Sequence, residues 1–123
     1  MKKTILIIDD DNRNIFALSA ILKAKGFVTD SATNMKEAFE KLGDGMGTGF
    51  ILMDMMMPDM DGYEAIPLIK RNEQFRHIPV ISVTAQAMAG DREKCLAAGA
   101  DEYVSKPVDI DRLIEILKQK LHE

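Results

Sequence analysis

The sequence lacks tryptophan and contains a single cysteine, Cys95, so an internal disulfide and a cysteine-based zinc site are both excluded. No apolar run approaches the roughly 20 residues that a membrane-spanning helix needs. Residues 1–4 lead into only four apolar residues and then three aspartates, so we expect no signal peptide. Sixteen basic residues against twenty acidic ones give a net charge of −4, which argues against a general nucleic-acid binder.

What the sequence does contain is the composition of one small globular domain. Its 123 residues are 46% apolar, enough for a single buried core, and 29% charged, enough to keep the surface hydrated. We find no internal repeat, no low-complexity stretch and no linker. We therefore expect one soluble domain over residues 1–123, with a cytoplasmic location.

Five short apolar runs recur along the chain and indicate strands. Three of them are nearly continuous and rich in β-branched or large apolar residues, which is typical of strands buried on both faces of a parallel sheet. The second run is more polar and suits the edge of a sheet. The predicted strands are Thr4–Ile8, Phe27–Ala32, Phe50–Met53, Val80–Val83 and Tyr103–Ser105.

Between these runs, apolar residues recur at helical spacing. Asn34 and Asp61 precede two of the segments as N-caps, each with a glutamate three residues later that completes a capping box. Pro67 falls inside the third helix, where it removes one backbone hydrogen bond, so we expect an irregular helix there. The predicted helices cover Ile15–Leu22, Met35–Leu42, a segment from Asp61 onward, Met88–Ala98 and Ile110–Leu121.

The strict alternation of strands and helices predicts an α/β domain with a parallel sheet and excludes a helical bundle or a β-sandwich. In such a sheet, ligands bind outside the carboxyl ends of the strands. The residues that follow four of the predicted strands are therefore the candidate site. They are Asp9, Asp10, Asp11, Asp54, Thr84 and Lys106.

These residue types suit a cation and an anion bound side by side. Carboxylates that lie close together repel one another unless a cation neutralises them, and oxygen-only ligands suit a hard ion such as Mg²⁺. A hydroxyl and an ammonium beside that ion would bind a second anion. Each of these residues alone would be an ordinary turn or cap residue. Because all of them are predicted to lie at one edge of the sheet, together they indicate a binding site.

The same segments resemble the receiver domain of two-component response regulators, the CheY-like family. The matching segments are Ile5–Asp11, Leu52–Gly62, Val83–Ala85 and Tyr103–Pro107, and the resemblance extends over essentially the whole chain. Asn12–Leu18 and Gly90–Ala100 resemble in particular the receivers of hybrid histidine kinases. The resemblance implies a single doubly wound (βα)5 domain, flavodoxin/CheY-like, with a five-stranded parallel sheet of order 2-1-3-4-5.

The resemblance also implies roles for the acidic residues. Asp54 would be the phosphoacceptor, which takes a phosphoryl group from a phosphohistidine and becomes an acyl phosphate. Asp10 and Asp54 would bind the cofactor Mg²⁺ directly, together with the backbone carbonyl of Met56. Asp9 would act through a metal-bound water.

Thr84 and Lys106 would bind phosphoryl oxygens, and the resemblance predicts a cis bond between Lys106 and Pro107 that places the ammonium over the phosphoryl site. Thr84 and Tyr103 resemble the family's switching pair: Thr84 moves toward the phosphoryl group, Tyr103 turns inward, and the face of the fourth helix, fifth strand and fifth helix changes shape. The implied partners are a histidine kinase or histidine phosphotransfer protein and a downstream protein, with no nucleic acid and no membrane. The chain would be a signalling domain rather than an enzyme, and a monomer or weak dimer.

The resemblance implies that Met56 and Gln86 lie beside the path of a hydrolytic water. A methionine thioether is a poor hydrogen-bond partner and covers the approach with apolar atoms. The amide of Gln86 could still bind a water, and a bound water there would favour hydrolysis. We therefore expect the acyl phosphate on Asp54 to hydrolyse slowly for a receiver.

Other functions fit the sequence less well. A phosphatase of the haloacid-dehalogenase type needs a second Asp two residues after the nucleophile, where this chain has Met56. A calcium-binding loop that starts at Asp59 would need Glu at its twelfth position, which is Lys70, and the glycine-rich segment 45–49 lacks the lysine of a phosphate-binding loop. A receiver that has lost phosphorylation and only binds partners stays open, although the complete set of Asp, Thr and Lys argues against it.

Overall fold

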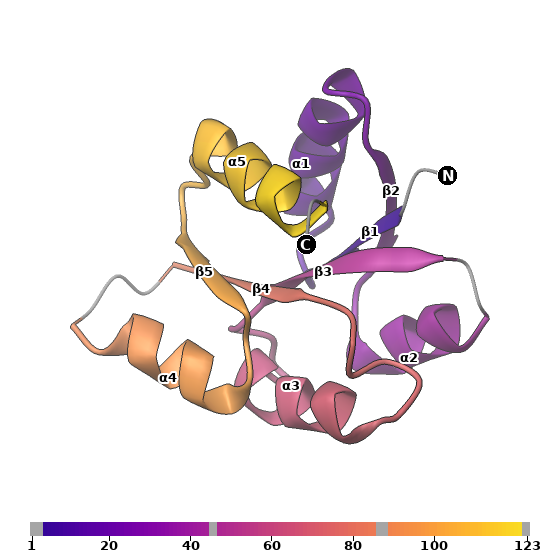
Figure 1. Cartoon of the computed structure of the whole chain (residues 1–123), viewed down its shortest axis with the longest axis vertical. Coiled ribbons are helices and arrows are strands. Elements are labelled where there is room, and N and C mark those ends of the chain that lie inside the picture. Colours follow the sequence, from indigo (N-terminus) through magenta and orange to yellow (C-terminus); the bar gives the residue numbers. More distant parts are fainter. Residues whose placement is uncertain (1–3, 45–46, 86–88, 122–123) are drawn as a thin grey trace.

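The computed structural model describes residues 4–44, 47–85 and 89–121. Its centre is a five-stranded parallel sheet of order β2-β1-β3-β4-β5 (Figure 1), which confirms the predicted α/β architecture. The strands are β1 (Thr4–Ile8), β2 (Val28–Ala32), β3 (Thr48–Asp54), β4 (Val80–Thr84) and β5 (Glu102–Ser105). β3 begins earlier than predicted because Thr48 pairs with Thr4 of β1.

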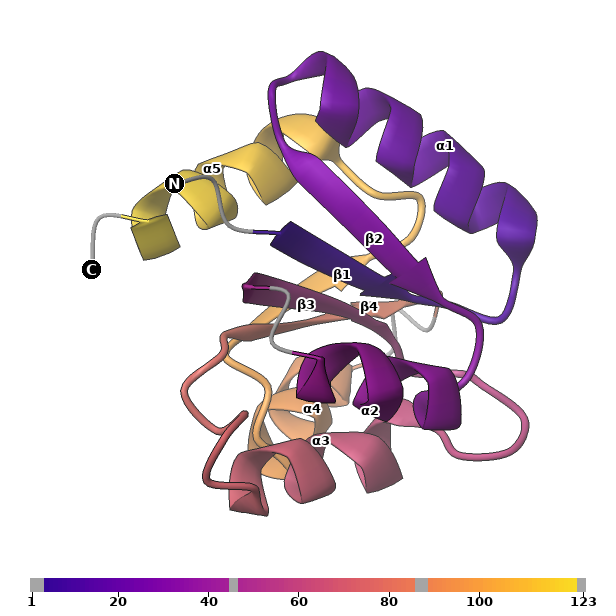
Figure 2. The ribbon, with the colours of Figure 1, turned by 90° about the vertical axis from the view of Figure 1, so that its right-hand side faces the viewer.

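Five helices cover both faces of the sheet. α1 and α5 lie on one face, and α2, α3 and α4 lie on the other (Figure 2). The helices are α1 (Asn12–Ala24), α2 (Met35–Gly43), α3 (Gly62–Arg71), α4 (Asp91–Ala98) and α5 (Ile110–Leu121). Within the described part of the chain, no helix combines the length and the apolar composition that a membrane crossing requires.

The core consists of two apolar layers, one on each face of the sheet. Because successive side chains of a strand point to opposite faces, Leu6 and Ile8 pack toward α2 and α3, whereas Ile5 and Ile7 pack toward α1 and α5. These four side chains are nearly inaccessible to solvent, whereas that of Thr4, the first residue of β1, is half-buried. Burial on both faces explains the continuous apolar runs of the sequence, and it fixes the strand ends in space.

The fourth helix begins later than the sequence predicts, at Asp91 rather than at Met88, and Met88 itself lies outside the described residues. Gly90 precedes the helix with a φ of 92°, a left-handed conformation that an α-helix does not contain. The prediction was wrong because the composition around Gly90 is compatible with a helix, and sequence alone does not reveal the sign of φ at a glycine.

Pro67 does not divide α3, which runs without a break over Gly62–Arg71. Proline has no N–H to donate to the carbonyl of Tyr63, so the helix loses one hydrogen bond there. Ile66 and Ile69 are fully buried in the core on either side of the proline. We infer that this packing offsets the missing hydrogen bond, which explains why the expected irregularity is not a break.

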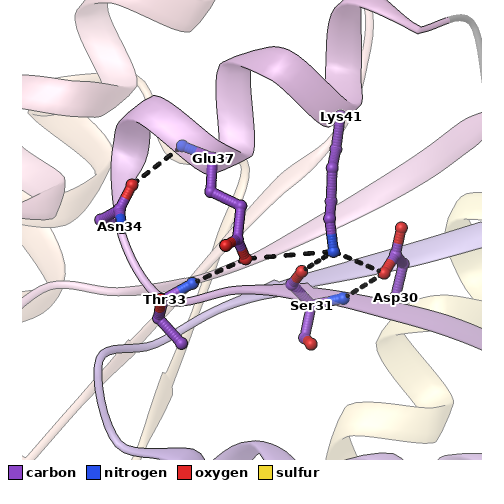
Figure 3. A network of polar contacts seen from close by, with 6 residues as sticks. All are labelled: Asp30, Ser31, Thr33, Asn34, Glu37 and Lys41. Atoms are coloured by element: carbon purple, nitrogen blue, oxygen red, sulfur yellow. Dashed lines mark hydrogen bonds and ion pairs between the residues drawn. The ribbon is translucent and has the colours of Figure 1, made fainter.

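The edge strand β2 is tied to α2 by a network of polar contacts (Figure 3). Lys41 of α2 donates to the side chain of Asp30 at 2.9 Å and also to the carbonyl of Ser31. The carbonyl of the next residue, Ala32, accepts from the N–H of Asp9 on the side of β1. Because successive carbonyls of a strand point in opposite directions, the carbonyl of Ser31 points to the free edge of the sheet. Lys41 therefore occupies an edge acceptor that another strand could otherwise use.

The same network caps the N-terminus of α2. The side chain of Asn34 accepts from the N–H of Glu37 at 2.8 Å, and the Glu37 carboxylate accepts from the N–H of Thr33 at 3.3 Å (Figure 3). The two contacts form the predicted capping box, with the return bond shifted by one residue. Partial burial opposes ionisation of Asp30, but the contacts with Lys41 and with the Ser31 N–H outweigh it and lower the pKa of the Asp30 carboxyl.

Candidate functional site

Asp54 is the last residue of β3, the central strand of the sheet. The chain stays aligned with β4 just beyond it, because the N–H of Met55 donates to the carbonyl of Val83 at 3.1 Å. The Asp54 residue is only 5% exposed, and its Oδ1 accepts from the N–H of Met56 at 3.2 Å. The central strand therefore delivers a nearly buried carboxylate to the rim of the sheet, with one backbone donor fixing its orientation.

Asp9 and Asp10 follow the neighbouring strand β1. Asp9 is 6% exposed, and its Oδ1 accepts from the N–H of Asp11 at 2.9 Å, whereas Asp10 is exposed. One carboxylate oxygen each from Asp9, Asp10 and Asp54 lies within 4.8 Å of the others. The structure thus brings together the three predicted metal-binding carboxylates.

Lys106 reaches the same rim from the end of β5. Its Nζ lies 3.5 Å from Oδ2 of Asp9 and 3.6 Å from Oδ1 of Asp54. The Lys106 N–H donates to the carbonyl of Thr84 at 2.8 Å, and the bond to Pro107 is cis, as predicted. The ammonium of Lys106 therefore lies between two carboxylates that come from different strands.

The charges at this rim do not balance. Asp9, Asp10 and Asp54 carry three negative charges, and Lys106 supplies one positive charge. Burial is the main cause that raises the pKa of Asp54; the negative charge of Asp9 also raises it, while the Met56 N–H and the Lys106 ammonium oppose the shift. A cluster of oxygen donors with excess negative charge fits a divalent hard cation such as Mg²⁺.

This imbalance predicts that Asp54→Asn stabilises the protein when no divalent cation is present. Burial raises the pKa of Asp54, so the free energy of unfolding of the wild type falls as pH rises through that pKa and the carboxyl ionises. The asparagine variant has no carboxyl to ionise and does not lose this stability. We expect the variant to melt about 4 °C higher at neutral pH, the shift that about 1 kcal/mol produces in a domain of this size. The difference from wild type should shrink toward acidic pH.

Thermal unfolding of wild type and Asp54→Asn in EDTA measures this effect. Asp59→Asn removes an exposed carboxylate from the same loop and serves as the control. An Asp54→Asn protein no more stable than wild type at neutral pH would contradict the proposed charge imbalance.

The loop after Asp54 alternates between buried and exposed methionines. Met55 and Met57 are 0% and 6% exposed, whereas Met56 is 50% exposed. An added Cβ at Gly62 would overlap the sulfur of the buried Met55 side chain and lie 3.0 Å from the Met55 Cα, so glycine allows α3 to begin this close to the loop. The side chain of Met56 is therefore the one of the three that faces solvent at the rim.

Thr84 and Tyr103, the predicted switching pair, lie on neighbouring strands. Thr84 is fully buried at the end of β4, and Tyr103 is a half-buried residue of β5 that packs on the α3 and α4 side of the sheet. Gln86, the second residue predicted to flank a hydrolytic water, lies outside the described residues.

Asn14, which the sequence pattern does not single out, donates from Nδ2 to Oδ2 of Asp9 at 3.5 Å. Asn14 also lines a cavity of about 320 Å³ that extends from the carboxylates to Leu18 and Ile21 of α1 and to Val108. A signal was present: Asp11 caps α1 and accepts from the N–H of Arg13, so the first turn of that helix begins directly beside the rim.

The sequence pattern of the response regulator receiver domain matches residues 5–118. The chain belongs to this family. It is 36% identical over 121 residues to the polar-differentiation response regulator DivK of Brucella anthropi, and the alignment covers 98% of each chain. The predicted family is thereby confirmed, and this receiver is a domain of two-component signalling rather than a classical enzyme.

Two solved structures of receivers from histidine kinases are similar over the whole fold. The receiver of a sensor histidine kinase from Pseudomonas aeruginosa, solved with a magnesium ion in its active-site cleft, is 32% identical, covers 100% of both chains and has a TM-score of 0.87. The receiver of a signal transduction histidine kinase from Syntrophus aciditrophicus is also 32% identical, with a TM-score of 0.86 and coverage of 98% of this chain and 90% of that one. Receivers in general bind Mg²⁺ and interact with histidine kinases or phosphotransfer proteins.

Proposed function

We propose that this receiver, over residues 1–123, accepts a phosphoryl group from a phosphohistidine onto Asp54. The observation that supports the proposal most strongly is the geometry of the Asp54 carboxylate. It is nearly buried, its Oδ1 is 3.6 Å from the Lys106 ammonium, and it lies beside the carboxylates of Asp9 and Asp10. A histidine kinase or a histidine phosphotransfer protein would be the donor, and another protein would recognise the phosphorylated form.

In the proposed reaction, a carboxylate oxygen of Asp54 attacks phosphorus and forms an O–P bond while the N–P bond of the phosphohistidine breaks. The electron pair of that bond leaves with the imidazole nitrogen, so the donor returns to its neutral form once a proton is taken up. Phosphoryl transfer of this kind depends on positioning and charge neutralisation more than on proton transfer. The Met56 N–H orients the attacking carboxylate, the ammonium of Lys106 neutralises charge on the phosphoryl oxygens, and the buried hydroxyl of Thr84 donates a hydrogen bond to one of them.

Asp10 and Asp54 would bind Mg²⁺ directly, the Met56 carbonyl would supply a further oxygen, and Asp9 would contact a metal-bound water. When bound, the ion supplies charge neutralisation for the carboxylates and the incoming phosphoryl group. Asp9 is held in place by the N–H of Asp11 and by Lys106.

The proposed output is a change in the α4-β5-α5 face. Thr84 ends β4 and Tyr103 lies on the adjacent strand, where Ser82 is its partner in the register. Movement of Thr84 toward a phosphoryl group on Asp54 would open space into which the Tyr103 ring turns. This local charge event would favour one of two arrangements of the face that a downstream protein reads.

Incubation with acetyl phosphate and Mg²⁺ tests the proposal. We expect the intact mass of the wild-type protein to rise by one phosphoryl group, and the mass of Asp54→Ala to stay unchanged. If the wild type gains no phosphoryl group while Mg²⁺ binds and the fold is intact, the chain is a receiver that only binds partners.

Mg²⁺ in the millimolar range is predicted to raise the melting temperature of the wild type, because a ligand that binds only the native state stabilises it by mass action. Asp10→Asn should weaken this effect strongly, since it removes one of the three clustered carboxylates. A potassium chloride titration at matched ionic strength controls for general screening. A wild-type melting temperature indifferent to Mg²⁺ would count against the metal site.

Met56→Asn is predicted to shorten the lifetime of phosphorylated Asp54. The thioether of Met56 is half-exposed at the rim and cannot orient a water well, whereas an asparagine amide can. An acceleration of about tenfold needs only about 1.4 kcal/mol of barrier, which one side chain can supply. The measurement is the decay of the phosphorylated protein after removal of the donor, and an asparagine variant that decays no faster than wild type would disprove shielding by Met56.

A further inference from the structure

The first turn of α4 contains a buried carboxylate, that of Asp91, one oxygen of which has no hydrogen-bond donor among the described residues. Asp91 is 4% exposed, and its Oδ2 accepts no hydrogen bond from any residue within the described ranges. Asp91 does not cap its own helix, because Gly90 is the N-cap residue and supplies no side-chain bond. Unsatisfied buried acceptors are rare in native proteins because each loses its hydration without compensation.

The buried carboxylate lies in a small polar cluster between α3, α4 and β5, three elements that pack side by side (Figure 1). Cys95 follows Asp91 by one helical turn, so the two share the buried face of α4. The hydroxyl of Tyr63, from α3, lies 3.9 Å from the sulfur of Cys95. Tyr103, from β5, packs against the same part of the core.

Both tyrosines can donate a hydrogen bond, and the negative charge of Asp91 contributes to a raised pKa of each hydroxyl. Burial is the main cause that raises the pKa of Tyr63 to about 12, with further contributions from Cys95, Asp91 and Asp61. Burial and the negative charge of Asp91 likewise raise the pKa of Tyr103. The two phenols therefore remain protonated at neutral pH.

The present pairing of donors and acceptors is mismatched. A tyrosine hydroxyl is a strong donor, yet that of Tyr63 contacts a thiol, which is a weak acceptor. The strong acceptor in the cluster, Oδ2 of Asp91, has no donor within the described part of the chain. A donor brought to Oδ2 of Asp91 by a movement of the first turn of α4 or of an aromatic ring would correct the mismatch.

We propose that Asp91 is a positioning residue of the switch: when Asp54 is phosphorylated, Oδ2 of Asp91 accepts a hydrogen bond from the Tyr103 hydroxyl and fixes the first turn of α4. This inference rests on the proposed phosphorylation of Asp54 and on the proposed inward turn of Tyr103. An acceptor that is unpaired in one state and paired in the other favours the second state by the free energy of that hydrogen bond. Asp91 would thus couple the ring position to the helix that a partner recognises.

Hydrogen exchange of the α4 amides in the full chain, with and without beryllofluoride and Mg²⁺ as a stable phosphoryl mimic, tests the coupling. In the wild type we expect the mimic to slow exchange about fivefold, the change that one hydrogen bond produces. Asp91→Ala should abolish the slowing, while Asp91→Asn, which keeps an acceptor oxygen, should retain most of it. Tyr103→Phe should match Asp91→Ala, and the double variant should show no further loss.

Tyr63→Phe identifies the donor. It should keep the slowing, and loss of slowing in Tyr63→Phe but not in Tyr103→Phe would overturn the assignment of Tyr103. Full slowing in Asp91→Ala would overturn the role of Asp91.

Acetyl phosphate labelling of the same proteins separates this inference from the proposed function. Asp91→Ala should gain the same phosphoryl group as wild type, because Asp91 lies outside the carboxylate cluster. Labelled protein with no dependence on Asp91 disproves only the coupling, whereas a wild type that takes up no phosphoryl group disproves the proposed function as well.

Discussion

Lys106→Met is expected to slow the phosphorylation of Asp54 by acetyl phosphate about 100-fold or more. The Nζ of Lys106 lies 3.6 Å from the Asp54 carboxylate, on the rim where the phosphoryl oxygens must be placed. In enzymes, removal of one preorganised donor to a developing oxyanion costs about 100-fold to 1,000-fold in rate. Methionine keeps the length and apolar stem of lysine, so the variant removes the charge with little change in packing.

The initial rate of phosphorylation, followed by intact mass, measures this effect. Lys23→Met, at an exposed position of α1, removes a lysine far from the rim and should react at the wild-type rate. A Lys106→Met protein that is phosphorylated as fast as Lys23→Met would show that the ammonium does not act on the phosphoryl group.

Removal of divalent cations with EDTA is expected to lower the same rate by about 100-fold or more. Without a bound cation, Asp9, Asp10 and Asp54 present excess negative charge to a negatively charged phosphodonor. Charge stabilisation by a metal is worth several kcal/mol, and about 1.4 kcal/mol corresponds to tenfold in rate.

Re-addition of Mg²⁺ should restore the wild-type rate, and Asp10→Asn should need a higher Mg²⁺ concentration for half-maximal rate. Asp59→Asn removes a carboxylate of the neighbouring loop and should respond to Mg²⁺ like the wild type. A rate that EDTA leaves unchanged would contradict the need for a metal at this rim.

Much of the fold and of the candidate site follows from the sequence, because buried parallel strands leave a clear pattern. Ile5–Ile8 and Phe50–Met53 are apolar on both faces, and the residues that follow these neighbouring strands must meet at one rim. The clustering of Asp9 and Asp54 could thus be predicted without coordinates.

Other features depend on backbone angles and side-chain directions that the sequence does not display. The start of α4 depends on the φ of Gly90, and several charged residues follow it without a clear apolar face. No periodicity shows that Asp91 is the buried one among them, or that Asn14 turns toward Asp9. The burial of Asp91 is set by the packing of α4 against α3 and β5, and the direction of Asn14 is set by how α1 begins beside the rim.

Transfer of a radiolabelled phosphoryl group from a phosphorylated histidine phosphotransfer protein tests the central claim most directly. The wild type and Asp59→Asn should both become labelled in the presence of Mg²⁺, while Asp54→Asn, which differs only in the acceptor oxygen, should remain unlabelled. Equal labelling of Asp54→Asn and wild type would contradict the assignment of Asp54 as the phosphoacceptor.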